Sequence, residues 1–446
     1  MLLGKMKFLG APLLFLACSS FALGSSVARK SPKVHSIKRD NGTNAGSMLQ
    51  LSSDEDFHFE ILRVLGLAPY QGSDIGEVLV AANQIAPGNF ESYYSAFNDL
   101  ANRVHDAVSA IDSKTYPVSA RNALFREATY YRSADFYLHG NWNDSRIYSL
   151  WDKQLAAFNS AIALLPTPGE RVTLQGNGFK IPAIFFGTGL PGPRPTIIMC
   201  NGFDGAQEEM YHAIGEAVVQ RGMNVITFEG PGQPTVRRYQ NLGFIPEWEE
   251  VVTPVVDYAL TRPEVDAKKV GLWGQSFGGY LAPRAAAFEH RLAAVIAFDG
   301  IYSFAEGISE QFGPQLEAIY ETGNETLFNS IVAGVVANTS MPTSARWAIE
   351  QGLWSFNTQS AFQWFKKVQQ YTLDEVIQNI TAPVFVGDAQ NDMFFAGQAK
   401  ELAEKLGDRA TYHLFNAIDG AGEHCSLGAA MLSAQVVLDW FQSIVS

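Results

Sequence analysis

The chain has 446 residues, of which 47% are hydrophobic and only 17% are charged. This composition excludes an intrinsically disordered or collagen-like chain and supplies enough apolar material for one large core or two ordinary ones. The formal net charge is −13, although the first 39 residues carry seven basic and no acidic side chains. The remaining 25 Lys and Arg face 45 Asp and Glu, a net charge of −20, so we expect no nucleic-acid partner.

The N-terminus has the parts of a secretory signal peptide. Lys5 and Lys7 precede a ten-residue apolar run, Phe8 to Ala17, and small residues follow up to Gly24. A run of this length cannot cross about 30 Å of hydrocarbon, so we expect no stable membrane anchor. We therefore predict a signal peptide over residues 1–24 and a secreted protein.

A polar, basic leader is predicted over residues 25–53, with a kexin-type processing site at Lys38-Arg39. Behind a signal peptide, five Asn-x-Ser/Thr sequons favour a glycoprotein. They lie at Asn41, Asn143, Asn324, Asn338 and Asn379. Only Cys200 and Cys425 remain after the signal peptide, so the core and not a disulfide framework holds the fold. Whether these two cysteines pair is open.

Residues 54–168 are predicted to form a unit of four or five helices. Apolar side chains recur three and four positions apart between Phe90 and Ile111, which places them on one face of a helix. Ser53, with Asp56 three residues on, is expected to form a capping box at the start of the first helix. We expect this unit to act as an N-terminal cap.

The pattern changes after residue 168. Two short runs around Gly176-Asn177-Gly178 predict a hairpin, and six apolar runs follow, most of them separated by helix-like stretches. The runs are Arg171–Leu174, Lys180–Phe186, Thr196–Cys200, Asn224–Phe228, Lys269–Trp273, Leu292–Phe298, Pro383–Val386 and Thr411–Phe415. Runs buried on both faces, with helical crossovers, predict a mostly parallel eight-stranded α/β sheet. We assign residues 169–300 and 374–446 to this core, and residues 301–373, too long for a connection, to a helical lid insertion.

Ser276 has the surroundings of a nucleophile elbow. It stands in Gly274-Gln275-Ser276-Phe277-Gly278, directly after a predicted buried strand and before an Ala-rich stretch. In so tight a turn a side chain at either glycine would clash, and the serine oxygen is lifted clear. A Gly-flanked serine in an ordinary turn is the alternative, but the strand-turn-helix context favours the elbow.

A serine hydroxyl needs a base, and the base needs a partner that orients it. In an α/β-hydrolase the acid follows the seventh strand and the histidine follows the eighth. Asp392, or Asp388 as the alternative acid, and His424 hold these positions. His413 lies inside the last predicted strand and is interpreted as a core histidine. The order Ser276, Asp392, His424 predicts the α/β-hydrolase fold.

The negative oxygen of a tetrahedral intermediate needs two donors. We expect the backbone N–H of Phe277, just after the nucleophile, and that of Phe203, in the loop after the third strand, with Asp204 as the fallback. This loop follows the carboxyl end of a parallel strand, where open sheets hold ligands.

Further residues of the predicted insertion have less definite roles. Glu306 and Glu310 are candidates for an extra proton donor. Six aromatic residues could line a substrate pocket or form the insertion's own core: Trp347, Trp354, Phe356, Phe362, Trp364 and Phe365. No His or Cys spacing typical of a metal site is present, so no metal is expected.

Three segments carry a resemblance to a known family: Arg126–Tyr137 in the helical unit, Gly274–Tyr280 at the elbow, and Gly422-Glu423-His424-Cys425. The chain from Asp54 to its C-terminus resembles the dihydroxypseudooxynicotine hydrolase type of α/β-hydrolase. That group includes fungal hydrolases that shorten or reshape polyketide precursors of pigments. The resemblance implies a cofactor-free enzyme that acts on carbon–carbon bonds next to carbonyls or on esters.

The sequence therefore predicts a secreted serine hydrolase with a small-molecule substrate, aromatic or polyketide-derived. It would cleave either a carbon–carbon bond beside a carbonyl or an ester. A triad-dependent cyclase or dehydratase, a secreted peptidase, and a ligand-binding protein without activity are the alternatives. If the protein self-associates, we expect a homodimer.

Overall fold

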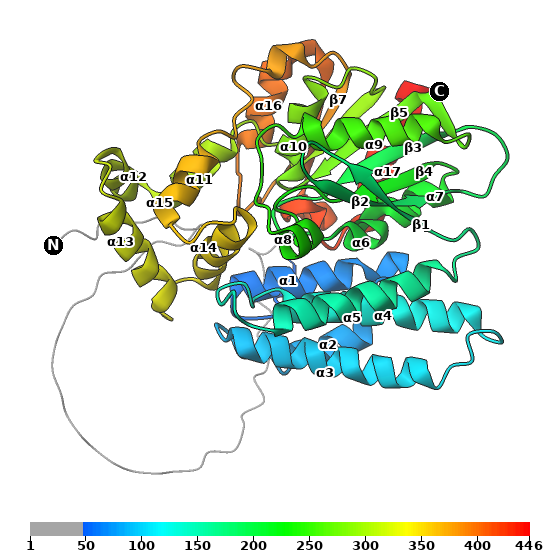
Figure 1. Ribbon diagram of the computed structural model, residues 1–446, viewed down its shortest axis with the longest axis horizontal. Coiled ribbons are helices and arrows are strands. Elements are labelled where there is room, and N and C mark those ends of the chain that lie inside the picture. The colour runs from blue at the N-terminus through cyan, green and yellow to red at the C-terminus, as the bar shows by residue number, and fades with distance from the viewer. Residues whose placement is uncertain (1–47) are drawn as a thin grey trace, which may run out of the picture.

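The computed structural model describes residues 48–446. The predicted signal peptide, the processing site after Arg39 and the Asn41 sequon lie outside the described residues. Five helices open the described chain, α1 (Glu55–Gly66), α2 (Ile75–Ala82), α3 (Phe90–Ser109), α4 (Pro117–Asp135) and α5 (Arg146–Ile162), with the short η1 (Ala68–Tyr70) after α1. Figure 1 shows them packed together as one layer beside the rest of the molecule.

Helix α1 begins one residue later than the predicted capping box. Asp54, and not Ser53, is the N-cap: its carboxylate accepts the N–H groups of Asp56 and Phe57. Asp54 has the extended backbone that an N-cap requires. The buried face of α1 then packs into the apolar core that the N-terminal helices share.

Eight strands form one sheet in the order β1-β2-β4-β3-β5-β6-β7-β8. The strands are β1 (Glu170–Gln175), β2 (Lys180–Phe186), β3 (Arg194–Cys200), β4 (Asn224–Phe228), β5 (Val265–Gln275), β6 (Ala294–Phe298), β7 (Val384–Ala389) and β8 (Ala410–Phe415). β2 pairs antiparallel with β1 and β4, and the remaining pairs, from β4 to β8, are parallel. The predicted eight-stranded, mostly parallel sheet is confirmed.

Helices cover both faces of this sheet. Apolar side chains of α9, α10 and α16 share one core with the strands, and those of α7, α17, α4 and α5 share the core on the other face. Every residue of β4 and of β6 is buried, as expected for parallel strands covered on both sides. The helices of the core are α6 (Gln207–Met210), η2 (Tyr211–Gly215), α7 (Glu216–Gln220), α8 (Pro234–Gln240), α9 (Glu249–Thr261), α10 (Gly278–Ala286), η3 (Ile377–Asn379), α16 (Gln398–Leu406), η4 (Gly407–Arg409), η5 (Ala417–Asp419), η6 (His424–Ser426) and α17 (Ala430–Val445).

Five helices lie between β6 and β7: α11 (Phe304–Phe312), α12 (Pro314–Glu321), α13 (Glu325–Ala337), α14 (Thr343–Ser355) and α15 (Ala361–Val368). They project from one side of the sheet in Figure 1. Helix α14 also contacts α1, and its Trp347 and Trp354 belong to the core of the N-terminal helices. The inserted helices and the N-terminal helices therefore meet.

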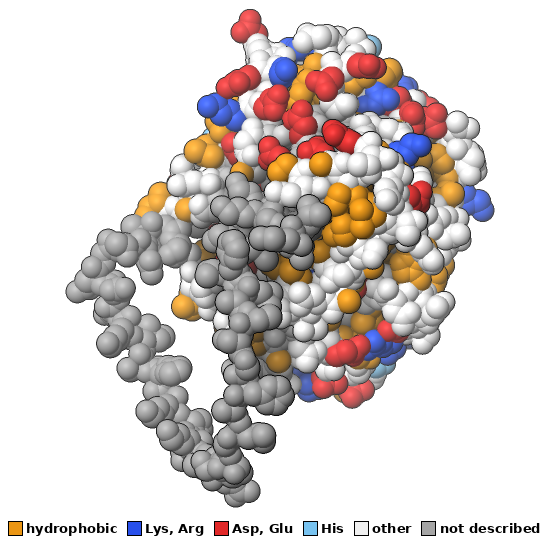
Figure 2. Space-filling model, turned by 90° about the vertical axis from the view of Figure 1, so that its left-hand side faces the viewer, with side chains coloured by type: hydrophobic (Ala, Val, Ile, Leu, Met, Phe, Trp, Pro, Cys, Tyr) orange, Lys and Arg blue, Asp and Glu red, His pale blue; other side chains and the backbone are white. Residues whose placement is uncertain are grey.

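The surface offers no membrane-spanning helix: within residues 48–446, none is both long and apolar enough to cross a bilayer. On the face seen in Figure 2, acidic and basic side chains are interspersed, with small clusters of hydrophobic side chains between them. Four sequon asparagines, Asn143, Asn324, Asn338 and Asn379, are solvent-exposed. Glycosylation at these positions stays a prediction.

Candidate active site

Ser276 lies in the turn between β5 and α10. Its φ of +58° is in the left-handed region that an L-residue rarely adopts. A Cβ on Gly274 would collide with the Gly278 carbonyl oxygen, and a Cβ on Gly278 would lie 2.6 Å from the Cys200 carbonyl oxygen. Only glycine fits at both positions, so the flanking glycines make this turn sterically feasible.

The structure brings Ser276, His424 and Asp392 together. His424 Nε2 lies 2.9 Å from Ser276 Oγ, and His424 Nδ1 lies 2.9 Å from Asp392 Oδ2. The other carboxylate oxygen of Asp392 accepts the N–H groups of Phe394 and Phe395 at 2.7 and 3.0 Å, which fixes its orientation. The three residues follow β5, β8 and β7, whose carboxyl ends share one edge of the sheet.

The alternative residues lie elsewhere. The Asp388 carboxylate accepts the hydroxyl of Tyr412 at 2.7 Å, and its contacts do not include His424. His413 is only half-buried, within β8, and its ring stacks on Phe385. The geometry therefore distinguishes Asp392 from Asp388, which the sequence left open.

Asp299 is a residue that the sequence reasoning missed. It directly follows β6, has a φ of +57°, and places Oδ2 2.9 Å from His424 Nδ1. The same oxygen accepts the N–H of Cys425. Two carboxylates thus face one nitrogen of the imidazole. The available signal was that a buried strand ends in an aspartate at the sheet edge where the other candidates converge.

These carboxylates determine the charge of the imidazole. Burial lowers the pKa of His424, but Asp392 and Asp299 outweigh it, so the pKa lies well above the ordinary value. Burial raises the pKa of Asp392, because it disfavours the charged carboxylate. The attraction of His424 and its hydrogen bond outweigh burial and hold the net pKa of Asp392 below the usual range. Both groups are thus arranged to stabilise an imidazolium beside Ser276.

Asp299, His424 and Cys425 form the one group of three ligand-type side chains that the described residues bring within 4.8 Å of one another. Its Asp and His are already joined by the contact that orients the imidazole. Cys200 and Cys425 are both free and buried, so the two thiols do not pair. Burial raises the pKa of each thiol to about 12, so neither is a ready thiolate ligand.

The predicted oxyanion loop lies against the elbow. A Cβ on Gly202 would be 2.8 Å from the Phe277 nitrogen, so the loop backbone passes directly beside that amide. Among the described residues, neither the Phe203 N–H nor the Phe277 N–H has an acceptor. Asn201 orders the loop, because its Oδ1 accepts the Gly202 N–H at 2.7 Å. From α14, Gln351 Nε2 donates to the Phe203 carbonyl at 3.1 Å.

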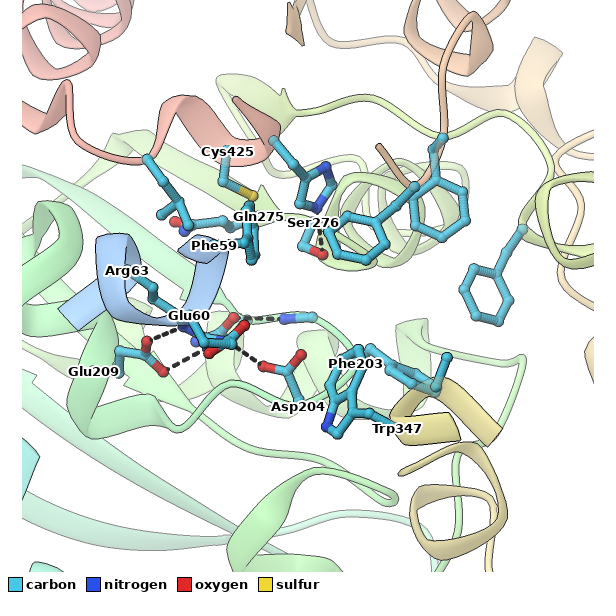
Figure 3. Close-up of a pocket in the computed structure, with 18 of the residues that line it drawn as sticks. Phe59, Glu60, Arg63, Phe203, Asp204, Glu209, Gln275, Ser276, Trp347 and Cys425 are labelled. Atoms are coloured by element: carbon cyan, nitrogen blue, oxygen red, sulfur yellow. Dashed lines mark hydrogen bonds and ion pairs between the residues drawn. The ribbon is translucent and has the colours of Figure 1, made fainter. Parts of the chain in front are cut away.

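Ser276 and His424 open into a cavity with about 820 Å³ of empty space, counted with its mouth to solvent. Six of its lining residues are Phe or Trp, and one group of lining side chains is charged (Figure 3). The lining residues include Phe59, Glu60, Arg63, Phe203, Asp204, Glu209, Phe304, Trp347, Phe394 and Phe395. Helix α1 brings Phe59 over the site, 5.3 Å from Phe394, whose ring lies 4.9 Å from that of His424. The N-terminal unit and the insertion therefore both form walls of this cavity.

The structure distinguishes the two alternatives for the aromatic residues of the insertion and corrects the expectation for its two glutamates. Among its six aromatic candidates, only Trp347 lines the cavity; the other five pack in or against apolar cores because their helices face inward. Glu306 and Glu310 are exposed and do not line the cavity, since α11 turns its apolar face towards it. The α11 residues that reach the cavity are Phe304, Ile308 and Gln311.

The sheet order and the elbow define the class: the protein is an enzyme with the α/β-hydrolase fold. A family described as esterase FrsA-like matches residues 104–304. The crystal structure of 2,6-dihydroxy-pseudo-oxynicotine hydrolase shares this fold, with a TM-score of 0.66 and 20% identity, over 85% of this chain and 95% of that one.

Fungal relatives place the chain more narrowly. It is 28% identical over 418 residues to the 20-hydroxy-prefusarin hydrolase FUS2 of Gibberella moniliformis, covering 89% of this chain and 98% of FUS2. It is 30% identical over 359 residues to the hydrolase ORFZ of Pyricularia oryzae, covering 76% of this chain and 84% of ORFZ. The chain belongs to the α/β-hydrolase family of these fungal enzymes, so the resemblance predicted from the sequence is confirmed.

Proposed function

We propose that the protein is a cofactor-independent serine hydrolase whose catalytic residues are Ser276, His424 and Asp392. Its substrate is an aromatic or polyketide-type small molecule, cleaved at an ester or at a carbon–carbon bond beside a carbonyl. The observation that carries the proposal is the pair of 2.9 Å contacts that join Ser276 Oγ to His424 Nε2 and His424 Nδ1 to Asp392.

In the first step, Ser276 Oγ attacks the substrate carbonyl while His424 Nε2 takes its proton. The carbonyl oxygen becomes an anion, which the N–H groups of Phe203 and Phe277 are placed to bind. Asp392 and Asp299 stabilise the imidazolium. The bond to the leaving group then breaks, and His424 returns its proton to the departing alkoxide or, after carbon–carbon cleavage, to the departing enolate.

The second step releases the acyl group from Ser276. Water attacks the acyl-enzyme, His424 accepts the water proton, and the same amides bind the second oxyanion. When the intermediate collapses, His424 returns the proton to Ser276 Oγ, and a carboxylic acid leaves. These steps use water and the side chains described above.

The cavity supports the class of substrate. Phe59, Phe203, Trp347 and Phe394 present aromatic surface next to Ser276, which suits a conjugated or ring-containing molecule. The FUS2 relative is a hydrolase of 20-hydroxy-prefusarin, which also supports a small-molecule substrate. The signal-peptide pattern of residues 1–24 and the exposed sequons support action in the secretory pathway or outside the cell.

The test combines active-site labelling with product analysis. A fluorophosphonate probe should label the purified protein at Ser276, and Ser276→Ala should abolish the adduct. Mass spectrometry of products from a panel of aryl esters, 1,3-diketones and peptides should then show Ser276-dependent cleavage of an ester or diketone. Absence of the adduct would favour a ligand-binding protein, and cleavage of peptides alone would favour a peptidase.

A further inference from the structure

A charged group of two guanidinium groups and three carboxyl groups lies at the cavity wall; four of the five line the cavity, and the fifth, Arg132, contacts the group from outside the lining. Arg63 makes paired contacts with Glu209, at 2.5 and 2.8 Å, and contacts Asp204 at 2.8 Å. Arg132 contacts the same two carboxylates, at 3.3 Å to Asp204 and 3.4 Å to Glu209. The carboxylates of Asp204 and Glu209 therefore balance the charges of the two guanidinium groups. The third carboxyl group, that of Glu60, is not needed for this balance.

Within residues 48–446, the Glu60 carboxyl group has no hydrogen-bond partner. It lines the cavity from α1 and is only 4% exposed, and its one ionic contact within the described chain is 3.5 Å from Arg63 Nη1. That guanidinium nitrogen already lies closer to Asp204. Figure 3 shows Glu60 in the same group as Arg63, Asp204 and Glu209. A buried carboxyl group that lines a cavity is available to hydrogen-bond to a molecule that enters it.

We propose that Glu60 is a substrate-binding residue that donates a hydrogen bond from a neutral carboxyl group to a second oxygen of the substrate, a carbonyl or hydroxyl oxygen distinct from the one held by Phe203 and Phe277. This inference rests on the proposed function, whose substrate class it narrows. The substrate would be an aromatic or conjugated carbonyl compound with a further uncharged oxygen.

The surroundings of Glu60 keep its carboxyl group neutral. Its pKa is raised to about 8: burial is the largest cause, Asp204 and Asp56 add to the rise, and Arg63 and Arg132 oppose it. The titratable and charged groups around it are Asp56 and Arg63 on α1, Tyr93 on α3, Arg132 on α4, Tyr137 after α4, Asp204 in the loop after β3, and Glu209 on α6. An acid held neutral in an apolar site is a strong donor to an oxygen acceptor.

The same charges discriminate among ligands. A ligand carboxylate would meet Asp204 and Glu209 with no guanidinium group left unpaired, so it should be rejected. An amine would need Glu60 ionised, which its burial opposes. An uncharged oxygen is the group that the cavity wall can bind without changing any ionisation state.

The experiment measures ligand binding in the Ser276→Ala background, where no turnover occurs. The probes are benzylacetone, butylbenzene and phenylbutylamine, which share a phenyl ring and a short chain but end in a ketone, a methyl group and an amine. At pH 6 the ketone should bind about fivefold to tenfold tighter than the hydrocarbon, the size of one hydrogen bond. This preference should shrink as the pH rises past 8, because ionised Glu60 no longer donates.

Two substitutions isolate Glu60. Glu60→Gln keeps an N–H donor that does not titrate, so the ketone preference should persist at pH 6 and at pH 9.5. Glu60→Leu should abolish the preference at both values. Glu55→Gln is the matched control, because Glu55 is an exposed glutamate in the first turn of the same helix, and it should behave like the parent.

Equal binding of the ketone and the hydrocarbon by the parent at pH 6, or tighter binding of the amine, would overturn the proposal. A Glu60→Gln variant that retains its thermal unfolding transition but loses the preference for the ketone would also overturn the proposal. This outcome can be interpreted whether or not Glu60→Leu folds. Fluorophosphonate labelling of Ser276 in the unaltered protein separates the two proposals. If Ser276 is labelled but the ketone is not preferred, only the proposed role of Glu60 is contradicted. If the ketone is preferred but Ser276 is not labelled, only the proposed serine hydrolase activity is contradicted.

Discussion

The two halves of the cavity are built in different ways. On the sheet side, Ser276, Asp392 and His424 each lie in a loop that directly follows a strand, and neighbouring backbone N–H groups hold the carboxylate. On the helical side, Glu60 and Trp347 come from α1 and α14, which are distant in the sequence and which the fold brings into contact (Figure 1). The sheet therefore positions the residues proposed to react, whereas the position of the residues proposed to select the substrate depends on helix packing.

The seam between the halves is held by buried side-chain contacts. Arg238 of α8 contacts Asp135 of α4 at 2.5 Å and donates to the carbonyl of Ile147 at 3.0 Å, and it is only 5% exposed. Trp347 stacks on Phe136 at 5.0 Å, which joins the insertion to the N-terminal unit. Changes on the sheet side should thus act on the chemical step, and changes at the seam or on the helical side should act on stability and substrate binding.

The largest effect should come from the acid on the sheet side. Asp392→Asn should lower kcat by about 10³-fold to 10⁴-fold, because the imidazole loses the partner that sets its tautomer. Asp388→Asn is the matched control, and its kcat should stay within about threefold of the parent value. Asp388 contacts Tyr412, so this substitution alters only a hydrogen bond at the surface. Steady-state kinetics on an aryl ester would measure both. Similar losses in the two variants would break the assignment of the acid.

A change at the seam should affect folding. Asp135→Asn leaves Arg238 as a buried, unpaired charge and should lower the free energy of unfolding by about 3–5 kcal/mol, measured by urea denaturation. Burial raises the pKa of Asp135, but Arg238 and His139 outweigh it and hold the folded-state pKa below the ordinary value. The contribution of Asp135 is therefore present above about pH 4 and is lost as the pH falls through the folded-state pKa. A variant with unchanged stability would show that the halves do not depend on this contact.

On the helical side, Trp347→Ala should raise KM for an aryl ester by about tenfold to a hundredfold, the value of one buried aromatic wall, with a smaller change in kcat. A short acetate ester, which does not reach this wall, should show a weaker effect. Trp364→Ala provides the contrast: Trp364 lies in the core away from the cavity, so its loss should lower the melting temperature and leave KM of the folded enzyme nearly unchanged. A fall in kcat with constant KM in Trp347→Ala would contradict the division of roles.

The smallest effect concerns Asp299. The neutral imidazole is the base, so kcat/KM should rise with pH as His424 loses its proton, with an inflection above the ordinary histidine pKa of about 6.5. Asp299→Asn removes one of the two negative charges and should move this inflection to lower pH by about one unit. The asparagine oxygen can still accept the Cys425 N–H, which preserves the turn. A pH profile of the variant that coincides with that of the parent would leave Asp299 with a purely structural role.

Much of the sheet side could be read from residue patterns. The hairpin pattern located β1 and β2, and six short apolar runs located the other strands. The signal is clearest for β4 and β6, because a strand buried on both faces needs continuous apolar sequence. The order of Ser276, Asp392 and His424 then placed three polar residues at one sheet edge. The sequence did not decide between Asp388 and Asp392, because Asp388 lies near the end of β7 and Asp392 only four residues further on, and only the path of the loop shows which carboxylate reaches His424.

The helical side was harder to read. Glu60 is one glutamate in an amphipathic helix, and no spacing distinguishes it from the exposed Glu55. Its chemistry depends on Asp204 and Glu209, which contact both guanidinium groups, and on its burial in the wall of a cavity that distant segments complete. Asp299 and Gln351 escaped notice for a similar reason: each acts through a contact with a residue more than 100 positions away.

Local sequence was sufficient for the elbow, the strands and the order of the three polar residues, because tight turns and buried strands impose steric and solvation requirements on adjacent residues. The choice of acid, the second carboxylate at the imidazole and the composition of the cavity wall arose only when distant segments packed together. Electrostatic and hydrogen-bond contacts depend on distances in space, and the linear order of residues does not specify those distances.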